Sequence, residues 1–330
     1  MLRLSPEGYG RFVQAQSLGV AYGGGEANVA VTLSHFGVDA QFVTKLPRHE
    51  MGQAAINSLR QFGVDTTEIV RGDGRLGLYF LERGASQRPS KVIYDRAGSA
   101  FATAQTADFD WDRILEGADW FHFTGIAPAL GDNVAAICLE ACKAAKAKGV
   151  TVCCDLNYRK NLWSRQKAGE VMAMFMEYVD VCIANEEHVA ELFGIRADSA
   201  EIVAGEVTHA GLRDVAIRLA ARFNFQKVGM TMRESLSADD NNWGAMLYDG
   251  NDCYFSRKYK IHMVDRVGSG DSFCGGLIYA CLHKFEPQAA VNFAVAAGVL
   301  KHSIEGDFNH ISADEAQALA QGDGSGRVQR

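Results

Sequence analysis

The strongest constraint on the fold is an alternation of short apolar runs with longer stretches of helical period, which begins at Asp39 and continues through most of the chain. The short runs predict buried strands at residues 40–46, 118–124, 150–156, 179–184 and 226–232. Residues 132–148 carry apolar side chains at three- and four-residue spacing, which predicts a helix with one face on the sheet. Helices are also predicted at 208–223 and 272–303. Successive βα units favour an α/β fold with a doubly wound, mainly parallel sheet flanked by helices.

Residues 72–97 interrupt this rhythm. Two stretches of alternating apolar residues flank a Gln-Arg-Pro turn without an intervening helix, which predicts an inserted antiparallel hairpin. Because a lone hairpin cannot bury itself, we expect it, with part of residues 1–22, to form a small β lid over a substrate cleft or against a second subunit. No long linker divides residues 1–330, so a single domain is predicted, with a flexible tail at 322–330.

Composition and charge exclude several functional classes. The formal charge of −7 argues against a general nucleic-acid binder, because that function requires an excess of basic side chains. None of the eight cysteines forms a CxxC pair, so we expect reduced, mostly buried thiols. The N-terminal residues lack a signal-peptide pattern and no apolar run is long enough for a membrane span. The sequence therefore predicts a cytoplasmic protein with a small-molecule ligand.

The most informative motif is Gly268-Ser269-Gly270-Asp271, which immediately precedes an apolar helical run. Glycines before a helix let the backbone approach an anion closely, and the free N–H groups of the first turn bind phosphate. Asp271 is a candidate catalytic base at this position. The alternative is structural, since an Asp in a first turn also complements the helix dipole or caps the helix.

A second glycine-rich motif, at residues 23–30, also opens a helical pattern. Gly24 and Gly25 permit close approach of a hydroxylated ligand, and the amide of Asn28 offers both a donor and an acceptor to a sugar. The motif is not a dinucleotide fingerprint, because Asn28 replaces the third glycine and no strand precedes it. A Walker A site is excluded, since the sequence has no Gly-Lys dipeptide.

The two motifs, their order and the hairpin between them resemble the ribokinase-like (PfkB-type) carbohydrate kinases over nearly the whole chain. Within that family the resemblance is to the 2-dehydro-3-deoxygluconate kinases. It rests on residues 2–6, 44–47, 77–82, 88–100 and 157–163, and further along on residues 233–235, 237–243, 265–273 and 300–309. The resemblance implies ATP-dependent phosphorylation of 2-dehydro-3-deoxy-D-gluconate on its terminal C6 hydroxyl, with Asp271 as base and Gly268, Ser269 and Gly270 forming the anion site.

An acidic sugar also agrees with the basic residues. Arg96 ends the second hairpin strand and Arg159 follows a sheet strand, and two converging guanidinium groups suit a carboxylate. Each could instead be a solvated surface charge, and a lid Tyr could be packing. By resemblance, the substrate-binding residues are Gly24, Gly25, Asn28, Tyr79, Tyr94, Arg96, Arg159 and Asp307.

The nucleotide and its cations are assigned by resemblance alone. The implied ATP-binding residues are Asn185, Thr231, Arg233, Gly268, Gly270 and Asn292, with Asn185 equally explicable as a strand-end turn. The resemblance also implies Mg²⁺, and a monovalent cation such as K⁺ as a further candidate. The family's Asn-x-x-acid motif, which helps to place Mg²⁺, here ends in His188, so Glu187 is the candidate for an indirect metal role.

Other features differ from the family pattern. Relatives usually carry a further strand ahead of residues 1–6, so either this chain's first residue is a late start or its central sheet has one strand fewer. Glu26 and His49 also stand where many relatives have a small residue or an acid.

Alternative functions follow from these observations. A kinase for 2-dehydro-3-deoxygalactonate differs only in the direction of one hydroxyl group of its substrate. A fructokinase would leave Arg96 and Arg159 without a carboxylate, and a non-catalytic sugar-binding protein would not need the GSGD motif. The exposed edges of the hairpin predict a homodimer through the lid.

Overall fold

The largest element of the structure, a computed structural model that describes residues 1–203 and 206–324, is a seven-stranded sheet. Its strands are β7 (Trp120–Thr124), β8 (Thr151–Asp155), β9 (Val181–Ala184), β12 (Lys227–Ser235), β13 (Asp240–Tyr248), β14 (Cys253–Phe255) and β15 (Tyr259–His262). They follow the order β14-β13-β12-β9-β8-β7, with β15 paired to β13. The strands from β12 to β7 are parallel, whereas β13 pairs antiparallel with each of its neighbours. The predicted α/β sheet is therefore present with an antiparallel extension.

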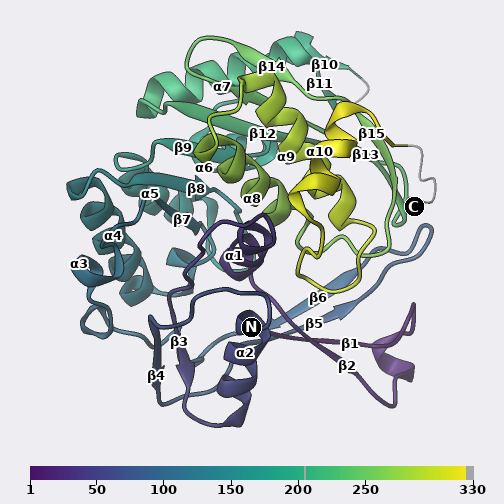
Figure 1. Ribbon diagram of the computed structural model, residues 1–330. Helices are drawn as coiled ribbons and strands as arrows, with labels where there is room; N and C mark the ends of the chain where they lie inside the picture. The colour runs from purple at the N-terminus through teal and green to yellow at the C-terminus, as the bar shows by residue number, and fades with distance from the viewer. Residues whose placement is uncertain (204–205, 325–330) are drawn as a thin grey trace.

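Helices cover both faces of this sheet (Figure 1). On one face lie α4 (Asp132–Ala147), α5 (Arg165–Met176), α6 (Glu186–Phe193) and α7 (His209–Phe223), and on the other α1 (Gly25–His35), α8 (Ser269–Leu282) and α9 (Pro287–Lys301). Alternate residues of β8 serve the two sides: Cys153 packs in the core with α8, and Cys154 packs in the core with α4. The helix predicted at 272–303 is two helices, because Lys284 adopts a positive φ and Pro287 starts α9.

The predicted hairpin is present as β5 (Leu78–Glu82) and β6 (Lys91–Asp95), paired antiparallel. It joins β1 (Leu2–Ser5) and β2 (Gly19–Tyr22) in a four-stranded sheet of order β2-β1-β5-β6, which extends away from the helices at the lower right of Figure 1. We call these four strands the lid sheet. The short β1 thus links the N-terminal segment to the hairpin.

The strand predicted at 40–46 differs from the expectation. Among the residues that the structure describes, the observed strand, β3 (Thr44–Pro47), pairs with β4 (Ile69–Gly72) alone, in parallel, and the two form a separate small sheet packed by α2 (Glu50–Arg60). The remaining elements are α3 (Trp111–Ile114), α10 (Ala313–Gln321), β10 (Ile202–Val203), β11 (Glu206–Val207) and the 3₁₀ helices η1 (Phe12–Gln14), η2 (Thr106–Asp108), η3 (Pro128–Leu130) and η4 (Ser199–Glu201). Most of the predicted tail, residues 325–330, lies outside the described residues.

Two expectations from composition can be compared with the structure. All eight cysteines are free thiols, and six of them are buried, so the predicted role as small apolar side chains is confirmed. Within residues 1–203 and 206–324, no helix is both long and apolar enough to cross a membrane.

Candidate active site

Asp271 lies in the first turn of α8, and the loop before it is tightly constrained. Gly268 is the N-cap, at φ 83°, and a Cβ there would lie 2.0 Å from the main-chain oxygen of Asp307. The Ser269 hydroxyl donates to the main-chain oxygen of Arg266 at 2.9 Å, which holds the turn together. Because the first turn of a helix leaves its N–H groups free, this motif presents donors next to the Asp271 carboxylate.

The other glycine-rich motif meets Asp271 directly, although 243 residues separate them in the sequence. Asn28 of α1 donates its side-chain amide to Asp271 Oδ2 at 2.6 Å. A Cβ on Gly25 would lie 3.7 Å from Asp271 Oδ1, so the missing side chain leaves space beside the carboxylate. The first turns of α1 and α8 therefore converge on one carboxylate, with room for a ligand between them.

The buried position of Asp271 changes its acidity. Burial raises the pKa of its carboxyl to about 7, despite the opposing hydrogen bond from Asn28, and the nearby carboxylates of Asp155 and Glu26 raise it further. A carboxyl group with a pKa near neutrality exchanges protons readily at physiological pH, which is the property required of a general base.

This raised pKa also makes a prediction about stability. Since the folded protein holds the Asp271 proton more tightly than the unfolded chain does, folding stability should fall as pH rises from about 4 to about 7. Asp271→Asn abolishes this loss, so we expect the variant to exceed the parent protein in unfolding free energy at pH 8, at about 1.4 kcal/mol for each pKa unit of difference.

Urea unfolding at pH 4.5 and pH 8 would measure both values. The matched control is Asp314→Asn, which neutralises an exposed first-turn Asp of α10 and should leave the pH dependence unchanged. Equal stability differences at the two pH values for Asp271→Asn would contradict the expectation.

A second buried carboxylate, Asp155, lies at the carboxyl end of β8. Burial raises its pKa to about 6, against the lowering effect of the Arg159 guanidinium. Asp155 accepts hydrogen bonds from the main-chain N–H of Asn157 at 3.0 Å and from its side-chain amide at 3.3 Å, and Asn157 takes a positive φ of 33°. This turn directs the chain to Arg159 at the sheet edge where open α/β folds bind ligands.

Several guanidinium groups gather around this edge. Burial lowers the pKa of Arg233 to about 10, and the neighbouring charges of Arg266 and Arg159 lower it further. Burial and Arg159 similarly lower the pKa of Arg96 and of Arg266, with Glu26 opposing the shift at Arg96. Like charges held this close repel one another, so the cluster of Arg96, Arg159, Arg233 and Arg266 favours binding of anions.

One part of the lid sheet is held by hydrogen bonds to Asp307, whereas another part places Arg96 with a free donor. The Tyr79 hydroxyl donates to both oxygens of Asp307, at 2.6 and 2.5 Å, and Arg3 donates to Asp307 Oδ1 at 3.1 Å. Arg3 also pairs with Asp265 at 2.7 Å. In contrast, the Arg96 guanidinium carbon lies 4.1 Å from the centre of the Tyr94 ring, and the buried Arg96 Nε has no partner within the described residues. Arg96 is thus placed with a free donor.

The Tyr79–Asp307 contact leads to a testable expectation. Tyr79→Phe removes a buried hydroxyl that donates to a buried carboxylate, and we expect it to lower the unfolding free energy by about 1.5–3 kcal/mol. Tyr94→Phe, in the neighbouring strand, is the matched control because its hydroxyl does not contact Asp307, and it should change stability little. Urea unfolding of both variants measures the effect, and similar values for the two would argue against the Asp307 contact.

Glu26 joins two elements of the site, a role that the sequence did not predict. Its carboxylate accepts from the main-chain N–H of Thr124 at 3.0 Å and from the Thr124 hydroxyl at 2.7 Å. It thereby ties the first turn of α1 to the carboxyl end of β7 and adds a negative charge near Asp271.

The remaining predicted residues lie on α6, β12 and α9. Asn185 caps α6, accepting from the main-chain N–H of His188 at 2.7 Å, while Glu187 is exposed in the first turn of that helix. Thr231 lies in β12 two residues before Arg233, and Asn292 lies in α9, where it accepts from Gln288 at 3.3 Å. Within residues 1–203 and 206–324, no three His, Cys, Asp or Glu side chains are grouped to hold a metal ion.

A doubly wound fold with a near-neutral carboxyl group at a helix N-terminus, and with a cluster of guanidinium groups near the second buried carboxylate, suits an enzyme that transfers an anionic group to a small hydroxylated substrate. Comparison with known proteins gives the particular family. The sequence matches the pfkB family carbohydrate kinase over residues 2–222 and 240–311, so the chain belongs to this family and is a sugar kinase. The expected family and enzyme class are thereby confirmed.

Individual relatives cover almost the whole chain. The crystal structure of 2-dehydro-3-deoxygluconokinase from Thermotoga maritima is 51% identical, with a TM-score of 0.94 over 98% of this chain and 96% of that one. A 2-dehydro-3-deoxygalactonokinase from Haloferax volcanii is 31% identical over 99% of this chain and 96% of its own length. A 2-dehydro-3-deoxygluconokinase from Bacillus subtilis is 26% identical over 94% of this chain and 89% of its own length. The similarity in structure confirms the expected ribokinase-like fold class.

Proposed function

We propose that the protein uses ATP to phosphorylate the C6 hydroxyl of 2-dehydro-3-deoxy-D-gluconate, giving 2-dehydro-3-deoxy-6-phosphogluconate and ADP. The observation that carries this proposal is that the chain holds both a near-neutral carboxyl, Asp271, and a buried Arg96 donor that has no partner within the described residues. The first suits deprotonation of a sugar hydroxyl, and the second suits a substrate carboxylate. Neutral sugars provide only the hydroxyl.

In this reaction Asp271 accepts the proton of the terminal hydroxyl as its oxygen forms a bond to the γ-phosphorus. The bond between that phosphorus and the β–γ bridging oxygen breaks, and ADP leaves with the electron pair. Asn28 holds the Asp271 carboxylate in place through the 2.6 Å hydrogen bond. Gly24 and Gly25 leave space for the sugar, while Tyr94, Arg96 and Arg159 orient it.

The first turn of α8 and the basic residues stabilise the phosphoryl group during transfer. Main-chain N–H groups at Gly268 and Gly270 donate to its oxygens, and Arg233 and Arg266 offset the charge of the triphosphate. Asn185, Thr231 and Asn292 are proposed to contact the nucleotide further from the reacting centre. Tyr79 and Asp307 support the substrate site through the contacts that anchor the lid sheet.

The side chains available as ligands are compatible with binding of Mg²⁺ through the substrate phosphates. Mg²⁺ typically keeps several waters and binds through substrate phosphates with one or two carboxylates, so it does not require a protein cluster of three ligands. Glu187, exposed at the start of α6, remains the candidate for an indirect contact. When bound, Mg²⁺ would neutralise charge on the phosphates, and a K⁺ ion is proposed as a further activator.

The name of one relative supports an alternative substrate. The relative that is 31% identical is named for the galactonate acid, whereas the Thermotoga and Bacillus relatives are named for the gluconate acid. The two acids share the carboxylate and the terminal hydroxyl that Arg96 and Asp271 would contact. The galactonate epimer is therefore the second candidate, and fructose is a weaker third.

A coupled ADP-release assay with ATP and Mg²⁺ tests the proposal on 2-dehydro-3-deoxygluconate, its galactonate epimer, fructose and ribose. Highest kcat/KM on the gluconate acid supports the assignment. Preference for the galactonate acid would transfer the function to the second candidate, and turnover on neutral sugars alone would overturn the carboxylate argument. Absence of turnover on all four would contradict the proposed function in every form.

We also propose a homodimer formed through the lid sheet, in the cytoplasm. Val20 of β2, with Val92 and Ile93 of β6, are large apolar residues exposed on this sheet, at 60%, 40% and 56%. Val20 and Ile93 stand in one cross-strand row through Leu4 and Phe80, and a row of apolar residues with exposed ends favours a protein contact. Sedimentation equilibrium of the protein and of an Ile93→Lys variant tests the dimer, which the substitution should dissociate.

A further inference from the structure

Arg3 of β1 is a buried arginine whose side chain is held at each of its nitrogens. Nε donates to the Ser5 hydroxyl at 2.9 Å, Nη1 donates to Asp307 Oδ1 at 3.1 Å, and Nη2 pairs with Asp265 Oδ2 at 2.7 Å. Arginine side chains are mostly exposed, and a buried one needs partners that compensate for the loss of water. The planar guanidinium therefore holds two buried carboxylates, those of Asp265 and Asp307, in one arrangement.

The first partner, Asp265, begins a segment that we call the phosphate loop, residues 265–270. Its Oδ1 accepts from the main-chain N–H of Val267 at 3.1 Å, which forms an Asx turn, and its Oδ2 accepts from the main-chain N–H of Gly306 at 3.1 Å. The turn leads directly to Gly268, the N-cap of α8, where the free N–H groups of the first helical turn begin. A movement of this carboxylate would therefore change the direction in which those N–H groups point.

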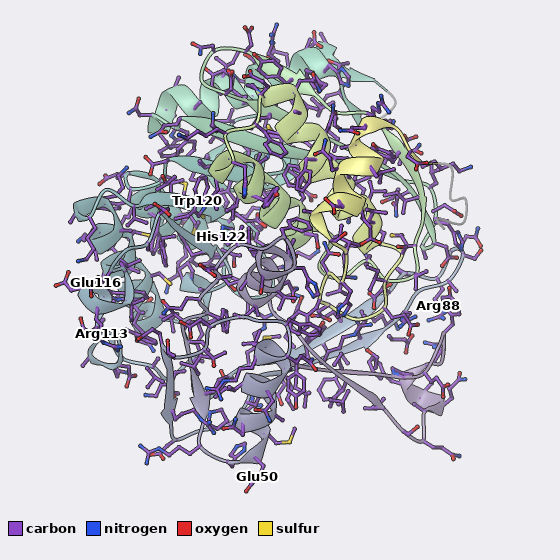
Figure 2. The ribbon with its side chains drawn as sticks, viewed as in Figure 1. Glu50, Arg88, Arg113, Glu116, Trp120 and His122 are labelled. Atoms are coloured by element: carbon purple, nitrogen blue, oxygen red, sulfur yellow. The ribbon has the colours of Figure 1, made fainter. Side chains whose placement is uncertain are left out.

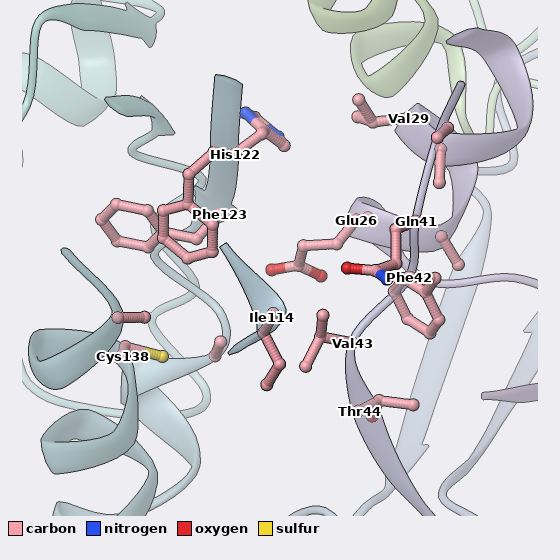
Figure 3. A pocket seen from close by; sticks show the side chains of 18 of the residues that line it. Glu26, Val29, Gln41, Phe42, Val43, Thr44, Ile114, His122, Phe123 and Cys138 are labelled. Carbon is pink, nitrogen blue, oxygen red and sulfur yellow. The ribbon is translucent and has the colours of Figure 1, made fainter. Parts of the chain in front are cut away.

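The second partner, Asp307, reaches the sugar side of the site. A Cβ on Gly23 would lie 2.0 Å from Asp307 Oδ2, so this carboxylate packs directly on the main chain of the glycine-rich motif at residues 23–30. Gly23 and Arg96 border a cavity of about 630 Å³, and Figure 3 shows the Glu26 carboxylate pointing into it. Asp307 therefore supports part of the wall of the space that is proposed to receive the sugar.

The main chain of Asp307 also touches the phosphate loop, because a Cβ on Gly268 would lie 2.0 Å from its carbonyl oxygen. The side chain of this residue thus packs on Gly23, while its main chain packs on Gly268. Since Arg3 binds Asp307 and Asp265 at the same time, one guanidinium sets the separation between the wall of the cavity and the phosphate loop. Contacts this close leave no void that could absorb a displacement of one segment.

Lys301 of α9 places a further positive charge beside this cluster. Its side chain is fully buried, its Nζ donates to the main-chain oxygen of Ile304 at 3.0 Å, and its Cε lies 3.4 Å from the Cβ position of Gly268. Burial lowers the pKa of Lys301 to about 8, while the carboxylates of Asp265 and Asp307 oppose this shift. The two carboxylates therefore keep a nearby cation when the guanidinium is removed, which favours folding of variants that lack it.

We propose that Arg3 is a positioning residue for phosphoryl transfer, which sets the distance between the phosphate loop and the bound sugar hydroxyl. This role rests on the proposed function, in which the γ-phosphate contacts the phosphate loop and the sugar enters the cavity. The reacting oxygen and phosphorus must lie about 3–3.5 Å apart, and a misplacement of about 1 Å can cost about a hundredfold in rate. Each substrate should still bind without Arg3, because each contacts only one side of the cluster.

Loss of this alignment should let water replace the sugar as the acceptor. A water oxygen then forms the bond to the γ-phosphorus, the bond to the β–γ bridging oxygen breaks, and ADP leaves with the electron pair. Asp271 accepts a proton of the water, and the product is inorganic phosphate instead of a phosphorylated sugar. The ratio of the two products therefore reports the alignment, whereas partial unfolding of an enzyme lowers both products by the same factor.

The test compares Arg3→Gln and Arg3→Lys with the parent enzyme, using ATP, Mg²⁺ and the sugar that the parent phosphorylates fastest. ADP, phosphorylated sugar and inorganic phosphate are measured together. For both variants we expect kcat for sugar phosphorylation to fall by about tenfold to a hundredfold, with little change in KM for either substrate. The ratio of inorganic phosphate to phosphorylated sugar should rise by a similar factor, because hydrolysis does not require the sugar to be aligned.

Arg3→Lys keeps the positive charge, but a single ammonium cannot reproduce the planar fork that joins two carboxylates. This variant should therefore show the same rise in the product ratio, and it decides the question if Arg3→Gln does not fold.

The matched control is Arg88→Gln, which removes another arginine that pairs with a buried carboxylate of the lid sheet. Arg88 Nη1 lies 3.2 Å from Glu82 Oε1, and Figure 2 shows Arg88 at the right-hand edge of the molecule, on the side away from α8. The product ratio of this control should equal that of the parent. A similar rise in Arg88→Gln would overturn the role of Arg3, because a general loosening of the lid sheet would then explain both variants.

The same measurements separate the role of Arg3 from the proposed function. Normal turnover by the parent enzyme, with an unchanged product ratio in Arg3→Lys, would overturn the positioning role and leave the proposed function intact. If the parent enzyme phosphorylates no sugar, the proposed function fails and the positioning role fails with it.

Discussion

Replacing Asp271 by Asn is expected to reduce kcat by about a hundredfold to ten-thousandfold, the usual contribution of a positioned general base. The substitution keeps the shape of the side chain and an oxygen that can accept from Asn28, so the site should remain assembled. KM for ATP should change little, because the effect is confined to proton transfer. Steady-state ADP release with 2-dehydro-3-deoxygluconate measures both constants.

The pH dependence adds an independent check on the same residue. Only the ionised carboxylate can accept a proton, so kcat/KM of the parent enzyme should fall as pH decreases below about 7, where burial places the pKa of Asp271. The kcat/KM of the Asn variant should not show this decrease at low pH. Asp314→Asn, on the exposed first turn of α10, is the control and should retain both its turnover and the decrease of kcat/KM at low pH. An Asp271→Asn enzyme with near-normal kcat would contradict the base assignment.

Much of the fold was predictable because its βα units carry local signals. The apolar runs of β8 and β9 are buried on both faces of a parallel sheet, and such runs, like the apolar runs of β7 and β12, are visible without knowledge of their neighbours. In contrast, β13 contains Asn241, Asn242 and Gly244, so it has no clear apolar pattern, and its pairing with β12 is a long antiparallel ladder set by tertiary contact. Sequence reasoning therefore missed that half of the sheet.

Some residues of the candidate site could likewise be predicted from local sequence patterns, and others could not. Gly268 and Asp271 form a continuous motif, and its role at a helix start follows from local geometry. The contact between Asn28 and Asp271 joins residues 243 positions apart, so no local pattern predicts it, and the resemblance implied only a separate role for each residue. Asp155, Arg266 and Glu26 were missed as site residues. A usable signal existed for Asp155 and Arg266, since Asp155 ends a predicted strand and Arg266 directly precedes the glycine motif.

Replacement of Arg96 by Gln is expected to lower kcat/KM for 2-dehydro-3-deoxygluconate by about a hundredfold to a thousandfold, the range for loss of one member of a buried charge pair. This prediction rests on the proposed function, in which Arg96 contacts the substrate carboxylate. Arg96 lies against Tyr94, and its buried Nε has no acceptor within the described residues, so the guanidinium is positioned before the substrate arrives. Most of the loss should appear in KM, because the carboxylate is bound equally in the ground and transition states.

The comparison between substrates distinguishes carboxylate recognition from a general effect on the lid sheet. Fructose has no carboxylate, so its kcat/KM should change little in Arg96→Gln, and the preference for the acid over fructose should fall by nearly the full factor. Lys91→Gln is the matched control, because it removes a positive charge from the exposed start of the same strand, β6. Arg96→Lys should recover only part of the loss, since an ammonium group cannot reproduce the two parallel hydrogen bonds of a guanidinium. Equal losses on the acid and on fructose would mean that Arg96 supports the position of the lid sheet rather than the substrate carboxylate.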